Sequence, residues 1–451
     1  MARSISLLSR AIRLSFPEVD PMKRCKLVLA TFVAVCAAAG AQVVPSINGP
    51  ELPLSGTLRY DLRYAQIAQF YGGSQGNSQT SSLSGDLSYA NSNPAFPFGL
   101  TYSGGDLWNI SGSGGESGVF QHMLASQGIV RRKWSLQFSD DVDYIPQAPT
   151  TGFSGIPGVG DLPSQTTQPG QSVLTLNTRS VTNTTIANLS RSIGRATSLS
   201  GGGSYAVLRF PDNNGLEDNQ WQANGQISRR LSASDSFFGQ YVYSRSTYPG
   251  YTIAMDSQST MFGYTRTWGR RLQTSISMGP EWEKTSGIEV DLLGIMIPLP
   301  PSTSSGLSVN ASASYATRST TATLGYFQGT STGAGVLNSF GTRNKNLSGG
   351  ISRTFGRNLT IGATGAYMRS QALISEASLA AGSVEPGTAT DAEYGGVTAT
   401  RKWGRYLSFY ANYTATEQSS GSTLPTNAIS QLSQVIGFGA AYSPRAMHFK
   451  R

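Results

Sequence analysis

Apolar and polar positions alternate most clearly over residues 397–413. On the second half of this stretch, alternate residues would point to opposite faces of a strand: Leu407, Phe409, Ala411 and Tyr413 on one, and Ser408, Tyr410, Asn412 and Thr414 on the other. Another alternating run precedes them, and a short turn at Lys402, Trp403 and Gly404 separates the two. The stretch therefore predicts a tight antiparallel hairpin with one apolar and one polar face.

The turn of this hairpin recurs along the chain in the form Ser or Thr, Arg, any residue, an apolar residue, Gly, Arg. Copies begin at Ser190, Thr265 and Ser352, with looser copies at residues 131–134, 229–231 and Arg318. Successive copies are roughly 35 to 60 residues apart, which corresponds to two strands and a longer loop per unit. The repeat predicts an array of hairpins that closes on itself.

Alternating segments between the turns predict about 18 strands, with about 16 as the alternative count. They cover residues 57–70, 83–89, 96–110, 119–130, 134–139, 173–190, 197–210, 221–228, 237–248, 259–268, 272–282, 307–317, 320–329, 342–355, 359–373, 394–403, 406–416 and 429–442. Short turns fall at one end of this array and longer loops, such as 146–171 and 285–305, at the other. A sandwich has no reason to sort its loops by length, so the pattern predicts an all-β, antiparallel up-and-down transmembrane barrel. The even count places both termini on the short-turn, periplasmic side.

Charges and aromatic residues follow the same division between the two ends. Arg and Lys cluster at the short turns, whereas Asp and Glu lie in the long loops. The short-turn residues are expected to form a periplasmic girdle: Trp134, Arg191, Arg266, Trp268, Arg353, Phe355, Arg401 and Trp403. Basic residues interleaved with aromatic ones also suit single-stranded nucleic acid. We favour the girdle and predict no nucleic-acid partner, because the array follows one end of every hairpin.

The N-terminal region carries the features of a Sec-type secretory signal. Residues 22–26 are basic, residues 27–38 are apolar, and Ala39, Gly40 and Ala41 form a small-residue cleavage site. Residues 1–21 show no pattern of their own, and a start at Met22 gives a conventional signal peptide. Acylation at Cys36 is the disfavoured alternative, because the bulky Val35 precedes it. The predicted domains are residues 1–41 (extension and signal), 42–55 (short periplasmic segment), 56–443 (barrel) and 444–451 (tail).

Composition excludes most catalytic and metal chemistry. The chain has 52 Gly, 13% charged residues and a formal net charge of +9. Both cysteines lie in the predicted signal, so the mature chain has neither disulfides nor cysteine metal sites. Only His122 and His448 remain, and we predict no catalytic residue, cofactor or metal. A Ser/His dyad on His122, like that of outer-membrane phospholipases, is the enzymatic alternative, but no nucleophile motif accompanies it.

With these features the chain resembles bacterial outer-membrane β-barrel proteins of the porin-like type over residues 56–443, although it has no family-specific motif. No apolar run after the signal is long enough for a spanning helix, so insertion must use closed strands. The resemblance implies the outer membrane of a Gram-negative bacterium, its lipids and the barrel-assembly machinery as partners. Residues 434–442 are similar to the C-terminal assembly signal, although a polar tail follows. A homo-oligomer is left open.

The leading functional prediction is a passive diffusion channel for small hydrophilic solutes, because barrels of about 16 to 18 strands leave an aqueous lumen. An export barrel for an anionic polysaccharide and a structural or adhesive barrel are the alternatives. The candidate pore-lining residues carry both signs: Arg59, Asp61, Arg63, Asp141, Asp143, Asp161, Glu281 and Glu283. Mixed charge predicts weak ion selectivity. The resemblance also implies that residues 146–171 form a constriction loop in the lumen.

Overall fold

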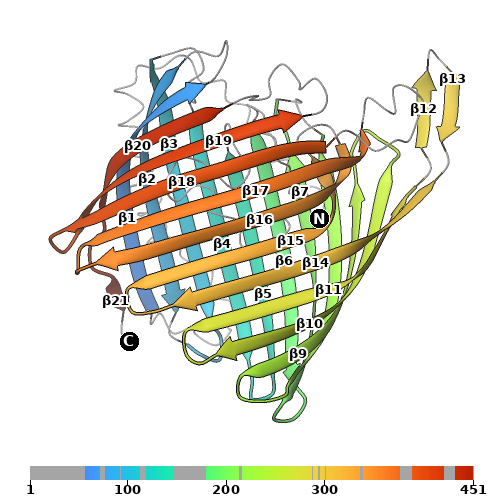
Figure 1. The fold of residues 1–451 in the computed structure, drawn as a ribbon, viewed down its shortest axis with the longest axis horizontal. Coiled ribbons are helices and arrows are strands. Elements are labelled where there is room, and N and C mark those ends of the chain that lie inside the picture. The colour runs from blue at the N-terminus through green and yellow to red at the C-terminus, as the bar shows by residue number, and fades with distance from the viewer. Residues whose placement is uncertain are drawn as a thin grey trace, which may run out of the picture. The chain divides into compact units, whose positions relative to one another are not determined.

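The computed structural model describes residues 56–71, 77–91, 93–111, 118–145, 179–212, 216–286, 288–292, 295–299, 301–335, 339–375, 389–420 and 432–449 (Figure 1). These residues form β-strands and short connections. None of them belongs to a helix long and apolar enough to cross a membrane. The predicted signal peptide and the predicted constriction loop lie outside the described residues.

The described residues contain twenty-one strands. Their bounds are Gly56–Tyr71 (β1), Ser78–Asn91 (β2), Phe98–Ser111 (β3), Gly118–Val130 (β4), Trp134–Ile145 (β5), Ser180–Ser192 (β6), Thr197–Arg209 (β7), Asp218–Arg230 (β8), Asp235–Thr247 (β9), Ala254–Trp268 (β10), Leu272–Thr285 (β11), Ile288–Leu292 (β12), Ile295–Leu299 (β13), Ser302–Ala316 (β14), Thr320–Gly335 (β15), Ser339–Phe355 (β16), Leu359–Ser375 (β17), Ala389–Trp403 (β18), Leu407–Ser420 (β19), Ser433–Tyr442 (β20) and Met447–Phe449 (β21).

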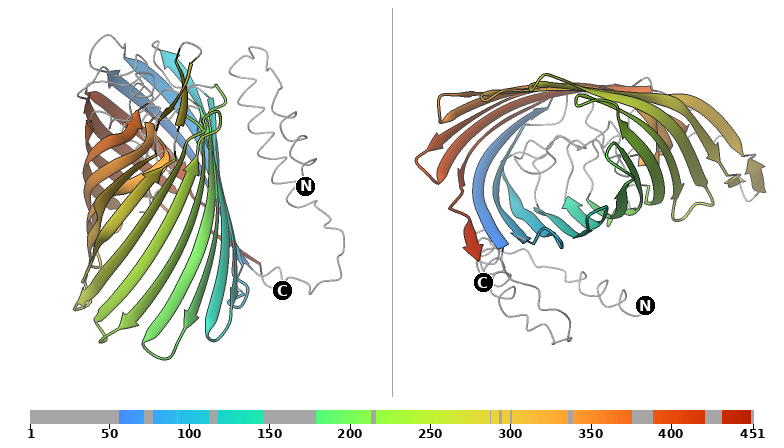
Figure 2. Two further views of the ribbon diagram at one scale, coloured as in Figure 1. Left: turned by 90° about the vertical axis from the view of Figure 1, so that its right-hand side faces the viewer. Right: turned by 90° about the horizontal axis from the view of Figure 1, so that it is seen from below.

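The long strands form one closed antiparallel barrel. Successive strands pair from β1 to β11 and from β14 to β20, and β11 pairs with β14. β1 also pairs with β20, from Leu62 opposite Tyr442 to Tyr71 opposite Ser433. The wall therefore has 18 strands and no free edge along this pairing. Figure 2 shows the wall from the side and from below. The predicted fold class and strand number are confirmed, and the alternative of 16 strands is wrong.

Two segments differ from the sequence-based expectation. Residues 285–305 are predicted to be a loop, but β12 and β13 form a separate two-stranded hairpin there, and β14 already begins at Ser302. Residues 444–451 are predicted to be a tail, but Met447–Phe449 pairs with Gly56–Leu58 of β1. In both places the residues lack strong alternation, so their backbone pairing with a neighbouring segment, which periodicity does not reveal, decides their structure.

The repeated Gly at the short turns is explained by its backbone conformation. Gly194, Gly269, Gly356 and Gly404 have φ values of 102°, 64°, 61° and 70°. Side chains disfavour this left-handed region, and a turn of this kind matches the twist of the strands that flank it. The Gly of the repeat is therefore required by the tight connection between neighbouring strands.

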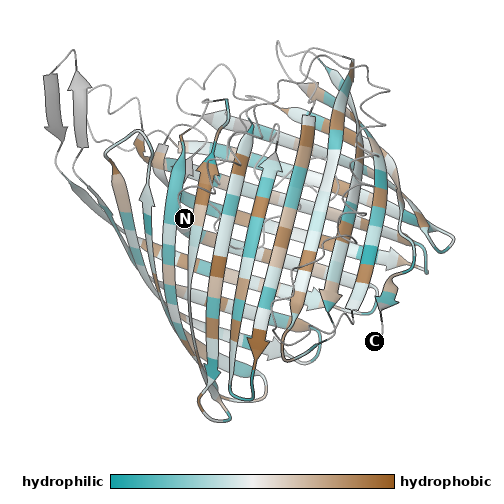
Figure 3. Cartoon of the chain, turned by 180° about the vertical axis from the view of Figure 1, so that it is seen from behind, coloured by the Kyte–Doolittle hydropathy of each residue, from teal (hydrophilic) through white to brown (hydrophobic). Residues whose placement is uncertain are grey.

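Side chains alternate between the outer and inner faces of the wall, which Figure 3 shows as alternating hydrophobic and hydrophilic bands along the strands. On β11, Met278 and Trp282 are 48% and 46% exposed, whereas Glu281 and Glu283 between and beyond them are only 5% and 3% exposed. The apolar side chains lie on the outer face and the carboxylates on the inner face. This is the distribution expected for a barrel with lipid outside and polar groups inside.

One close backbone approach within the wall gives a test of the fold. A Cβ at Gly279 of β11 would lie 1.7 Å from the carbonyl oxygen of Thr260, whereas a Cβ at Gly225 would meet no atom within 4 Å. We expect Gly279→Ala to lower the free energy of unfolding by about 1 to 3 kcal/mol or more, because the backbone must move. Urea unfolding followed by tryptophan fluorescence measures the change. Gly225→Ala is the matched control, and an equal loss in both variants would contradict this register.

Candidate functional site

The end of β15 and the start of β16 leave the wall together and extend into the barrel. β14 pairs with β15 only from Val309 opposite Gln328 to Ala316 opposite Thr321, although β15 continues to Gly335. Beyond Gln328, β15 stays paired with β16 and also contacts β8, β9, β10 and β11. In the strand order, β8 and β9 are separated from β15 by β10, β11 and β14. We call residues 329–335 and 339–344 the inner hairpin, because Thr330 and Thr332 bind Glu281 and Ser246, which lie on the inner face of the wall.

Thr332 fixes the tip of the inner hairpin to β8 and β9. Its hydroxyl lies 3.1 Å from Nε2 of Gln220, 3.0 Å from Oγ of Ser246 and 3.3 Å from Oγ of Ser244. Its carbonyl oxygen accepts a hydrogen bond from the hydroxyl of Tyr248. Thr332 is 1% exposed, so its polar atoms are satisfied inside the protein instead of by water.

Two carboxylates on β11 hold the base of the inner hairpin. Both carboxylate oxygens of Glu281 accept from the backbone N–H of Thr330, at 3.1 and 3.2 Å. Glu283 accepts from the hydroxyls of Thr330 and Ser304, and its Oε2 lies 3.3 Å from Nη2 of Arg343 on β16. Removing one partner of such a buried pair leaves the other charge without compensation, so these contacts favour the docked hairpin.

A small apolar cluster covers the other side of the inner hairpin. Phe340, which is fully buried, packs edge-on against Tyr248 and Tyr251, with ring centroids 4.9 and 5.1 Å apart. Its other members come from three parts of the wall and its connections: Leu208, Phe210, Leu216, Ile253, Met255 and Ile374. Burial raises the pKa of Tyr248, so its hydroxyl stays protonated and donates to Thr332.

Sequence reasoning missed the inner hairpin, although the chain carries a signal for it. The outer face of β15 and β16 begins as an exposed apolar surface, with Leu324 and Leu347 56% and 46% exposed. Every second residue along a strand lies on the same face, so this face also carries Thr330 and Thr332 on β15 and Arg343 on β16. Polar residues on this face suit the polar inner wall, which is where they bind. The predicted constriction loop at residues 146–171 lies outside the described residues.

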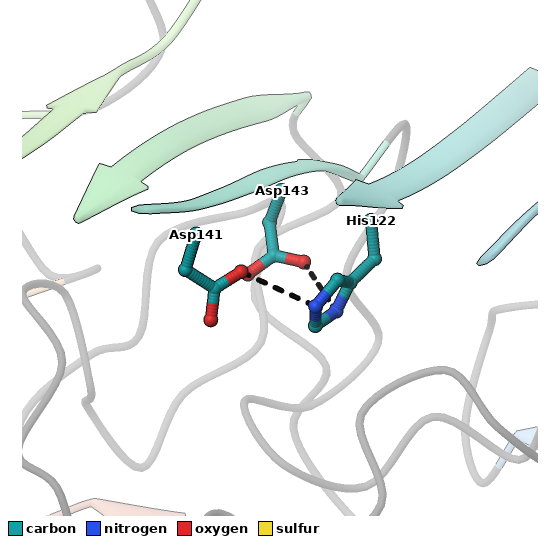
Figure 4. A group of neighbouring side chains, drawn as sticks. All are labelled: His122, Asp141 and Asp143. Atoms are coloured by element: carbon teal, nitrogen blue, oxygen red, sulfur yellow. Dashed lines mark ion pairs between the residues drawn. The ribbon is translucent and has the colours of Figure 1, made fainter. Parts of the chain in front are cut away.

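A second group of polar residues lies on the inner wall, on β4 and β5. His122 is opposite Asp143 in the register, and Asp141 is opposite Leu124. The imidazole lies between the two carboxylates: Nδ1 is 3.1 Å from Asp143 and Nε2 is 3.2 Å from Asp141 (Figure 4). His122 therefore contacts acidic groups through both nitrogens, and neither nitrogen contacts a hydroxyl nucleophile in the described part of the chain.

The other predicted pore-lining residues are placed as follows. Arg59, Asp61 and Arg63 share the face of β1 that is opposite the exposed Leu62 and Tyr64, and Arg63 forms an ion pair of 2.5 Å with Asp86 on β2. Asp161 lies outside the described residues. Asp86 was missed by the sequence analysis, although its place opposite Asp61 in the register puts it on the same face.

The predicted girdle residues lie at the short-turn ends of the strands. Trp134 is opposite Arg191, and Trp134, Trp268, Phe355 and Trp403 are 41% to 64% exposed. The guanidinium of Arg266 lies 4.2 Å from the ring centre of Trp268, and that of Arg353 lies 5.2 Å from Phe355. Arg401 shares this two-residue spacing with Trp403. The Arg266 and Arg353 pairs thus offer an aromatic ring and a cation side by side.

Comparisons with known proteins find likenesses in structure alone. No family model and no curated protein matches the sequence. OccK2 (OpdF) of Pseudomonas aeruginosa is similar with a TM-score of 0.45 and 10% identity, over 86% of this chain and 98% of that one. OccAB4 of Acinetobacter baumannii has a TM-score of 0.44 and 10% identity, over 88% and 100%. The ferric citrate transporter FecA gives 0.45 and 10%, over 88% and 65%. Similarity at this level assigns no function to this chain.

The backbone at Gly341 gives a test of how the inner hairpin is held. Gly341 and Gly356 both have positive φ, 69° and 61°, but only at Gly341 would a Cβ meet neighbours, at 2.8 Å from the Met255 side chain and 3.1 Å from Leu373. Left-handed backbone costs about 1–2 kcal/mol for Ala at either site. In addition, we expect Gly341→Ala to loosen the inner hairpin and to make Phe340 accessible to chymotrypsin. Gly356→Ala should not have this second effect. Mass spectrometry of the fragments detects the cut, and equal resistance in both variants would contradict the packing described.

Proposed function

We propose that this chain is an outer-membrane channel through which small hydrophilic solutes diffuse passively. The observation that carries the proposal is the closed 18-stranded wall with apolar side chains outside and charged side chains of both signs inside. A wall of this size encloses more space than its own side chains fill. In lipid, closure also satisfies the backbone hydrogen bonds of every strand, which an open sheet cannot do.

The inner hairpin would set the width of this channel. It is held against the inner faces of β8 to β11 by Thr332, by the two β11 carboxylates and by the cluster around Phe340. Chain that lies inside a barrel takes cross-section away from the solute. The inner hairpin therefore has the role that the resemblance assigned to residues 146–171, and the two segments can both contribute.

The girdle supports an orientation in the membrane. Trp268 and Phe355, each beside an Arg, would rest at headgroup level, where the ring is amphipathic and the guanidinium can reach lipid phosphates. The short-turn end of the barrel, where β1 begins and β20 ends, would face the periplasm. Outer-membrane lipids and the barrel-assembly machinery are the partners this orientation requires.

The inner wall does not support the export of an anionic polymer. Such a barrel needs a bore lined by basic residues, whereas Asp86, Asp141 and Asp143 lie on inner faces of the wall. Carboxylates along the path would repel a polyanion. An enzymatic role has equally little support, because each imidazole nitrogen of His122 lies beside a carboxylate.

Removing the apolar anchor of the inner hairpin should widen the channel. Phe340→Ala deletes the ring between Tyr248 and Tyr251, and we expect single-channel conductance in a planar bilayer to rise roughly twofold, because the path available to ions grows. Phe438→Ala, at a ring 56% exposed on the outer face, is the matched control and should leave conductance unchanged. Unchanged conductance in Phe340→Ala would reject the narrowing role, and a wild-type protein without conductance would reject the channel.

The mixture of charges predicts weak ion selectivity. Arg63 with Asp86 and Arg343 with Glu283 pair opposite charges on the inside, which leaves little net potential to separate cations from anions. The reversal potential of the purified protein under a KCl gradient should lie close to zero. A strongly anion-selective value would favour the polysaccharide exporter instead.

A further inference from the structure

His122, Asp141 and Asp143 bring three side chains that can bind a metal ion close together on the inner wall. One ligand-type atom from each residue lies within 4.8 Å of the others. Nδ1 of His122 lies 3.1 Å from Asp143, close enough to donate a hydrogen bond to that carboxylate. Oδ1 of Asp141 is screened from solvent and accepts no hydrogen bond from the described residues, although Nε2 of His122 is only 3.2 Å away.

The chemistry of the imidazole explains why this arrangement is unusual. A neutral ring that donates from Nδ1 carries a lone pair on Nε2. That lone pair and a carboxylate oxygen would then face each other at 3.2 Å, an unfavourable contact unless a proton on Nε2 or a metal cation joins them. Two atoms bound to one zinc ion at about 2.0 to 2.2 Å are separated by a similar distance in a tetrahedral site.

We propose that His122 and Asp141 form a divalent metal site on the inner wall, with Asp143 orienting the ring. The metal would bind Nε2 of His122 and Oδ1 of Asp141, and the Nδ1–H of the ring would remain bonded to Asp143. A carboxylate that holds the second nitrogen of a metal-binding histidine is a common arrangement, since it fixes the tautomer and increases the basicity of the ligand. The proposed metal site differs from the sequence-based prediction that the chain has no metal site.

The ligand set indicates which ion would bind. One imidazole nitrogen with carboxylate oxygen suits zinc better than magnesium or calcium, which prefer oxygen ligands throughout. The side chain of His122 is 42% exposed, so an ion can reach it and water or a solute group can fill the remaining positions. The site depends on the wall alone, so it can exist whether or not the lumen conducts.

Calorimetric titration of zinc into the purified, untagged, metal-free barrel in detergent tests the proposal. We expect one zinc ion to bind per chain, His122→Ala and Asp141→Asn to abolish that binding, and Asp143→Asn to weaken it roughly 10- to 100-fold. Magnesium should not compete at equal concentration.

Two controls separate this site from unspecific binding. Asp140→Asn changes the neighbouring carboxylate, which bonds to Asn183 and Thr185 and not to His122, and His448→Ala removes the other histidine of the mature chain. Both variants should bind zinc as the wild type does. No zinc binding by a folded wild-type barrel, or binding that survives His122→Ala and Asp141→Asn, would overturn the proposal, and neither result would bear on conductance.

Discussion

The pairing of β1 with β20 is the interaction on which the rest of the barrel depends. Without it, both strands would present unpaired backbone groups, and no lumen would be enclosed. β1 and β20 are also tightly packed against each other. A Cβ at Gly439 of β20 would lie 2.2 Å from the carbonyl oxygen of Tyr64 on β1. The hydroxyl of Tyr410 donates to this same oxygen at 3.2 Å. The first and last long strands therefore meet only because a residue without a side chain stands at this point.

Closure makes the inner face of the wall a polar surface that is partly removed from bulk water, and the inner hairpin uses that surface. Glu281 and Glu283 are almost completely buried, a state that costs free energy for each charge. The backbone N–H of Thr330, the hydroxyls of Thr330 and Ser304 and the guanidinium of Arg343 offset this cost. The hairpin and the carboxylates thus stabilise each other, and the apolar cluster around Phe340 adds a contact that water does not weaken.

The two polar groups of the inner wall differ in how much freedom they leave to a passing solute. The carboxylates of Glu281 and Glu283 are used to hold chain that has entered the lumen, so they are not available to ions. His122, Asp141 and Asp143 stay on neighbouring strands of the rigid wall, and the imidazole is partly exposed. Charge on the inner face therefore has two uses in this barrel, one structural and one open to a ligand.

The sequence by itself determined the class of fold, because side-chain alternation, the repeated Gly turns and the sorting of loop lengths are all local features. It also placed Glu281 and Glu283 on the other face of the strand from Trp282, since neighbouring residues of a strand point to opposite faces. Only the tertiary structure decided that β15 leaves β14 after Gln328 and that Thr332 binds Ser246, because these contacts join strands that are far apart in the chain. The same holds for His122, which looked like an isolated residue until the register of β4 and β5 brought two carboxylates to its ring.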